Sequence, residues 1–146
     1  MLLERASRVF KEQRIESYTT DVLLTRVSML LRQTYVLVGF QTPDENDLAI
    51  ITAKLTSDLF ESYRYLTCGE VSLCFELGAK GEYGEFMGLN MRTFTRWLKA
   101  YKTSDFRYRL VVDREQKRQA ALPPVSEAYN REREEQMLQN AFRHYR

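Results

Sequence analysis

The fold depends most on the stretch from Glu70 to Tyr101, which reads EVSLCFELGAKGEYGEFMGLNMRTFTRWLKAY. Its first part has the apolar spacing of a buried helix, and glycines interrupt its middle. Its last part predicts a helix from Met91 to about Lys102, with Asn90 as its N-cap. One side of this helix is aromatic and the other is basic, so we expect Phe94 and Trp97 to anchor it to the core.

The basic side of the 91–102 helix carries cations about one turn apart. Cations at this spacing can contact successive phosphates, and a neighbouring threonine can add a hydrogen bond. Two arginines further along the chain would widen the same surface. The predicted nucleic-acid-binding residues are Arg92, Thr95, Arg96, Lys99, Lys102, Arg107 and Arg109. The alternative is a solvated helix face, or cations that pair with the protein's own carboxylates.

The charge of the chain is unevenly distributed, although its net charge is only +2. Residues 41–90 carry three bases and nine acids, whereas residues 91–118 carry nine bases and three acids. These two segments could pack against each other, or the basic segment could face an anionic partner. The sequence leaves both interpretations open.

Apolar periodicity and capping residues predict an all-α fold, a bundle of five or six helices. The segment FRYRLVVDR at 106–114 can be either a strand or a helix, and Tyr35 to Val38 either a frayed helix end or a short strand. Pro123-Pro124 predicts a boundary between a helical domain at 1–122 and a charged helical extension at 123–146. Ser126 is the expected N-cap of the helix in this extension. The other expected helices run from Leu2 to about Ser17, from Thr19 or Thr20 to about Tyr35, from the cap Thr42 to about Arg64, and from the capping box Thr67–Glu70 to Gly78 or Gly81.

Several classes of function lack support in the sequence. The glycines between 78 and 88 have no following Gly-Lys-Ser/Thr, so they do not form a P-loop. His144 is the single histidine, and with Cys68 and Cys74 it matches no zinc pattern. We therefore expect no enzyme activity, cofactor or metal, although a carboxylate site using Glu70 or Glu76 would indicate a nuclease. Without a signal peptide or membrane-length apolar run, a cytoplasmic protein with reduced thiols is expected.

The two helices at 70–78 and 91–102 are similar to a helix-turn-helix, except that about a dozen residues connect them instead of three or four. Three local patterns lie between Leu66 and Tyr101: Leu-Thr-x-x-Glu, then Gly-x-Tyr-Gly, then Leu-Asn-x-x-Thr-Phe-x-x-Trp-Leu. With these patterns, the segment resembles small helical replication accessory proteins of phages and mobile elements, of the helicase loader or regulator type. The resemblance implies contact with DNA or a replicative helicase, and implies no catalytic residue.

These observations predict a non-enzymatic, DNA-associated accessory protein of a phage or mobile element that binds nucleic acid through its basic helix. The alternative is a protein-interaction module, an inhibitor or adaptor that engages a host protein through its charged surfaces and C-terminal helix. The identity of the partner, any DNA sequence preference and the oligomeric state stay open.

Overall fold

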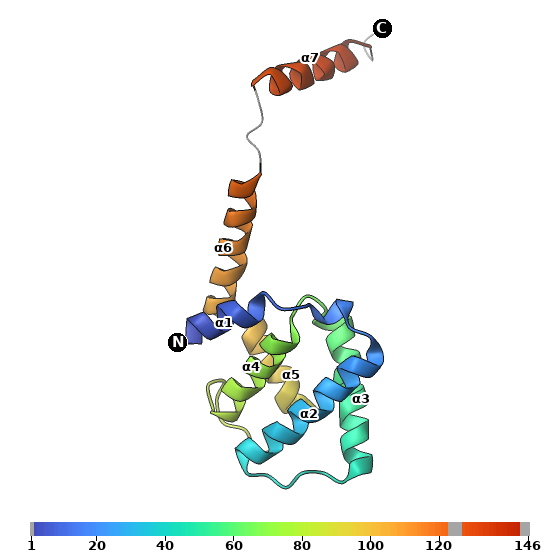
Figure 1. Ribbon diagram of the computed structural model, residues 1–146, viewed down its shortest axis with the longest axis vertical. Helices are drawn as coiled ribbons and strands as arrows, with labels where there is room; N and C mark the ends of the chain where they lie inside the picture. The colour runs from blue at the N-terminus through green and yellow to red at the C-terminus, as the bar shows by residue number, and fades with distance from the viewer. Residues whose placement is uncertain (1, 123–126, 144–146) are drawn as a thin grey trace. The chain divides into compact units, whose positions relative to one another are not determined.

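The computed structural model describes residues 2–122 and 127–143, with the side chains of 127–130 left undescribed (Figure 1). The all-α prediction is confirmed, because the described residues contain helices and only an isolated bridge between Arg14 and Thr67. Within the described residues, seven α-helices form rather than five or six, together with one 3-10 turn. Their bounds are α1 Leu2–Phe10, η1 Ile15–Ser17, α2 Thr20–Val38, α3 Glu45–Ser62, α4 Cys68–Ala79, α5 Met91–Lys102, α6 Asp105–Ala121 and α7 Glu127–Arg143.

The observed N-caps of the helices agree with the predicted ones, with one exception. Thr19 caps α2, Thr67 and Glu70 form the predicted capping box of α4, and Asn90 accepts a hydrogen bond from the backbone N–H of Thr93. The predicted cap of α3 at Thr42 is wrong. Asp44 takes that role instead, accepting from the N–H of Asp47 at 2.8 Å, because an aspartate carboxylate also caps well.

The N-terminal helix is shorter than expected, since α1 ends at Phe10 rather than near Ser17. The N–H of Ile15 donates to the carbonyl of Leu66 at 2.7 Å, and that of Glu16 donates to Arg64 at 3.1 Å. These bonds hold the backbone after α1 against the segment before α4, and they bury Ile15 completely. Here the hydrogen bonds to a distant part of the chain outweigh the local preference for a helix.

Two ambiguous segments are both helical. Residues 35–38 are the last turn of α2, which ends where Gly39 adopts a φ of 82°, a left-handed conformation that glycine tolerates. Residues 106–114 belong to α6, in which Phe106, Arg107 and Leu110 face the core at helical spacing. This extra helix accounts for the larger number of helices.

The chain divides into two compact units, Met1–Val111 and Val112–Arg146, and α6 crosses the boundary. In the first unit, α4 packs against α1, α2 and α5, and α2 also packs against α3 (Figure 1). Consequently α4 is the most buried helix, with Leu73, Cys74 and Phe75 almost fully enclosed. The central position of α4 fixes the placement of α5, which carries the predicted site.

The second unit contains the end of α6 and the helix α7. Its side chains from 113 to 122 and from 131 to 143 are all exposed. The predicted boundary at Pro123-Pro124 and the predicted cap at Ser126 lie outside the described residues.

Candidate nucleic-acid interface

The inner side of α5 is an aromatic cluster that holds the helix against α4. Phe94 stacks on Phe75 with ring centroids 5.2 Å apart, and Trp97 meets Phe75 edge to face at 5.7 Å. The Trp97 ring also fills the space beside Gly78, where an added Cβ would lie only 2.2 Å from the indole. The expected anchoring by Phe94 and Trp97 is confirmed, and neither ring is available to stack on a nucleic-acid base.

The outer side of α5 carries exposed cations, as its spacing predicted. Arg92, Arg96, Lys99 and Lys102 are all exposed. The first three, with Thr95 and Met91, form one wall of a groove of about 550 Å³, and Lys54 and Asp58 of α3 form the other wall. Four cations and one carboxylate line this groove, so its local charge is strongly positive.

The charges in this groove are mostly open to solvent. Lys54 binds Asp58 at 3.0 Å within α3, and this hydrogen bond raises the pKa of the Lys54 ammonium. Arg96 donates to the backbone carbonyl of Glu85 at 2.8 Å, which leaves its charge unneutralised. Arg92 and Lys99 form no ion pair with any acidic residue in the described part of the chain.

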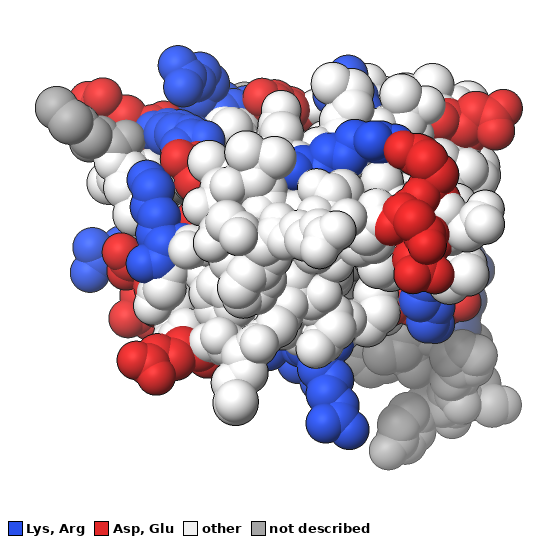
Figure 2. Space-filling model, turned by 90° about the horizontal axis from the view of Figure 1, so that it is seen from below, with Lys and Arg blue, Asp and Glu red and all other residues white. Residues whose placement is uncertain are grey.

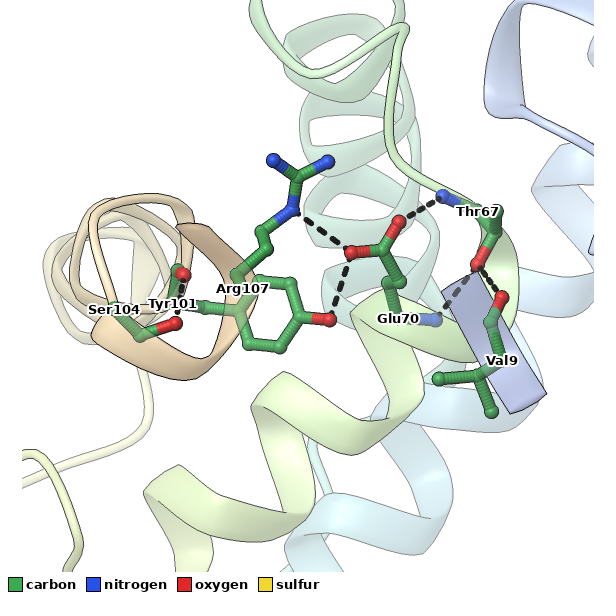
Figure 3. Close-up of polar contacts among 6 residues, drawn as sticks. All are labelled: Val9, Thr67, Glu70, Tyr101, Ser104 and Arg107. Atoms are coloured by element: carbon green, nitrogen blue, oxygen red, sulfur yellow. Dashed lines mark hydrogen bonds and ion pairs between the residues drawn. The ribbon is translucent and has the colours of Figure 1, made fainter. Parts of the chain in front are cut away.

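Arg107 does not belong to this surface, which corrects the expectation that it widens an exposed basic face. It is buried, and its Nε donates to a carboxylate oxygen of Glu70 at 2.9 Å (Figure 3). Its guanidinium also stands over the rings of Phe10 and Tyr65, at 5.6 and 5.2 Å from their centroids. The protein's own carboxylate and aromatic rings therefore hold this arginine.

Glu70 is fully buried, and three donors satisfy it. The backbone N–H of Thr67 donates to one oxygen, while the hydroxyl of Tyr101 at 2.7 Å and Arg107 donate to the other (Figure 3). The Thr67 hydroxyl donates in turn to the carbonyl of Val9. Burial, followed by the nearby Glu70 charge, raises the pKa of Tyr101, so its hydroxyl stays a donor. Glu70 thus joins α4 to α5 and α6, while Thr67 joins the same capping box to α1. The pattern of a capping box gave no sign of this second role.

The remaining predicted residues are dispersed. Arg109 lies exposed on α6, next to an exposed Tyr108, and it does not line the groove. Glu76, the second acid considered for catalysis, binds Arg5 and Lys80. Within the described residues no group of three or more His, Cys, Asp or Glu is placed to hold a metal. Cys68 and Cys74 are both free thiols.

None of the described helices is long and apolar enough to cross a membrane. Comparison of the chain with protein-family models, with curated proteins and with solved structures gave no match.

Proposed function

We propose that this chain is a non-enzymatic, DNA-associated accessory protein that binds the phosphate backbone through the groove between α3 and α5. The observation that carries the proposal is the open state of Arg92, Arg96 and Lys99, on a helix whose opposite side is fixed to the core. A rigid helix holds these cations without the entropic cost of ordering a loop.

Backbone contact suits this surface better than reading of bases. The aromatic rings of α5 are buried, so the groove offers cations and a threonine hydroxyl but no stacking platform. The connection between α4 and α5 spans residues 80–90, much longer than the turn of a helix-turn-helix. We therefore propose non-specific or weakly specific binding along the phosphates, with α5 lying on the backbone. The resemblance of residues 66–101 to replication accessory proteins supports a role of this kind in a phage or mobile element.

A fluorescence-anisotropy titration with labelled duplex and single-stranded DNA, first at low salt and then over a salt series, tests this proposal. The groove would neutralise three or four phosphates, so the logarithm of the duplex association constant should fall against the logarithm of salt concentration with a slope of about −3. Duplex should bind more tightly than single strands, because its charge density is higher. No binding of either DNA at low salt would end the proposal.

Charge-reversal variants locate the surface. Lys99→Glu is the cleanest change, because Lys99 lines the groove and contacts no described acid, and Arg96→Glu should weaken binding as well. Lys11→Glu makes the same change in net charge at an exposed position just after α1. Weaker binding by the groove variants, with near-normal binding by Lys11→Glu, supports the site. An equal loss in all three variants would show only a general electrostatic effect.

A second candidate function is favoured by α7. This helix exposes Met137, Leu138 and Phe142 on one face, while acids and arginines occupy much of the rest. An exposed apolar face on a charged helix suits insertion into a groove of a partner protein. If a chain lacking residues 119–146 loses capture of a replication or host protein, and the full chain binds no DNA, the adaptor interpretation is preferred.

A further inference from the structure

Met87 is the most exposed of the large apolar side chains in the described part of the chain, with a relative exposure of 104%. It lies in the connection between α4 and α5, which leaves the lower end of α4 in Figure 1. Its neighbours in sequence are not exposed in the same way, because Phe86 is half-buried against the core and Leu89 is buried. Met87 therefore projects from a segment that packs against the protein on both sides of it.

Three backbone carbonyls beside Met87 accept hydrogen bonds from side chains of α2 and α5. These bonds run from Arg96 to Glu85 at 2.8 Å, from Thr93 to Gly88 at 2.6 Å and from Tyr35 to Leu89 at 2.9 Å. Between them, the Phe86 ring meets Trp97 edge to face, with ring centroids 5.3 Å apart. The backbone is thus held on both sides of Met87, so binding through this side chain orders little additional chain.

The segment around Met87 is directly joined to the proposed DNA groove. Arg96 donates to the Glu85 carbonyl and also lines the groove, and Met91 lines it as well, four positions after Met87. The segment also exposes two acids, Glu82 and Glu85, and neither forms an ion pair with a described residue. The view from below in Figure 2 shows a largely uncharged face with basic and acidic side chains around its edge. DNA bound along the groove therefore comes close to both an uncovered apolar side chain and an unpaired acid.

We propose that Met87 is a wedge that enters the base stack of duplex DNA and kinks it, an inference that rests on the proposed binding of DNA along the groove. Apolar side chains, methionine among them, insert between base steps in proteins that bend DNA by about 20–90°. Unstacking is easiest at pyrimidine–purine steps, so the wedge gives a preference for TA or CA steps without contact to base edges. This agrees with weakly specific binding. A pocket of a partner protein would also accept a methionine, but Arg96 joins this segment to the cations of the groove, which favours DNA.

The bend of a DNA duplex tests the wedge in the full chain. A duplex of about 20 base pairs, with a central TA step and a fluorophore at each end, should show increased energy transfer when it is saturated with the wild type. Met87→Ala should still bind but leave the duplex straight, and Met87→Leu should keep most of the bend, because leucine is also a wedge side chain. The salt slope of Met87→Ala should stay at about −3, because Met87 neutralises no phosphate.

Glu85→Gln tests whether the DNA reaches this segment. Removing a carboxylate two positions from Met87 should strengthen duplex binding about two- to fivefold at low salt, because the phosphates then meet less repulsion. Met29→Ala is the matched control, since Met29 is 57% exposed on α2 and does not line the groove, and this variant should bend DNA normally. Circular dichroism checks that every variant keeps its helices.

Straight DNA in the wild-type complex, or a loss of the bend with Met29→Ala, would overturn the wedge. An unchanged bend with Met87→Ala would overturn it as well, and would point to a pocket of a partner protein as the site that takes Met87. Unchanged or weaker binding by Glu85→Gln would show that the DNA does not reach the segment. In each of these cases, duplex binding that Lys99→Glu weakens leaves the proposed function standing. If no DNA binds at low salt, the proposed function and the wedge fail together.

Discussion

Arg107 and the cations of α5 are neighbours in sequence, but the structure gives them opposite environments. Arg107 is 8% exposed and bound by Glu70, whereas Arg92, Arg96 and Lys99 face solvent in an open groove. All of them come from the same basic stretch. A run of cations can therefore serve two purposes: one cation pairs with a carboxylate inside the protein's own core, and the others remain available to an outside anion.

The physical basis of the difference is which acids each helix face meets. Glu70 is fully buried and accepts hydrogen bonds from Tyr101 of α5 and Arg107 of α6, and Arg107 supplies the positive charge that balances it. Among the described residues, Asp58 is the one acid that lines the groove between α3 and α5, and Asp58 is bound to Lys54. The proposed DNA surface is therefore the part of the basic segment that the acidic segment does not neutralise.

The largest expected effect comes from removing the buried carboxylate that binds Arg107. Glu70→Ala would leave Arg107 buried without its carboxylate and would remove the acceptor of Tyr101, so it should lower the free energy of unfolding by about 3–5 kcal/mol. Urea denaturation followed by circular dichroism measures the loss. Glu76→Gln on the same helix removes a solvent-facing pair and should cost less than about 1 kcal/mol. Similar values for the two variants would show that the buried pair has no special weight.

The next effect concerns the contact that fixes α5 in place. Gly78→Ala puts a Cβ only 2.2 Å from the Trp97 indole, so the helices must shift. Overpacking of this kind should cost about 1–3 kcal/mol, more than alanine gains through its helix propensity. Gly88→Ala is the control, since a Cβ added there would lie 3.6 Å from the side-chain amide nitrogen of Asn90. Both variants can be compared by thermal unfolding. An unchanged midpoint for Gly78→Ala would mean that Trp97 moves aside easily.

The parts of this fold that could be predicted from sequence are those with local causes. The caps at Asn90 and Thr67, and the burial of Phe94 and Trp97, depend on residues within a few positions of each other. The termination of α1 at Phe10 could not be predicted in this way. It depends on the bond between Ile15 and Leu66, which are far apart in the chain.

The candidate site shows the same division. The exposure of Arg92, Arg96 and Lys99 follows from helical spacing and could be predicted. Lys54, on the other wall of the groove, gave no signal, because its nearness to α5 is set by tertiary packing. The burial of Arg107 could not be predicted, because its partner Glu70 lies 37 positions earlier in the chain.

A smaller effect is expected from the loss of one solvent-exposed cation of the groove. Lys99→Gln removes one groove cation without adding a negative charge, so it should weaken duplex binding by about 0.5–1 kcal/mol, a few-fold in affinity, and make the salt slope shallower by about one. Its free energy of unfolding should be unchanged within about 0.5 kcal/mol, since Lys99 is exposed. Anisotropy and urea titrations of the same preparation separate binding from stability. A Lys99→Gln variant that loses stability and keeps its affinity for DNA would show that Lys99 serves the fold rather than DNA binding.

The smallest effect is the pH dependence of the surface pair between Arg5 and Glu76. The hydrogen bond from Arg5 holds the pKa of Glu76 below its usual value of 4.5, so the carboxylate is more acidic in the folded chain than in the unfolded one. A depressed carboxyl pKa stabilises the fold above the unfolded pKa, and this contribution is lost as the pH falls through the folded pKa. The stability difference between the wild type and Glu76→Gln should therefore be below about 1 kcal/mol at pH 7 and should shrink below about pH 4.5. Urea titrations at several pH values measure it. A difference that grows on acidification would mean that Glu76 is bound more tightly as the neutral acid, contrary to its position between Arg5 and Lys80.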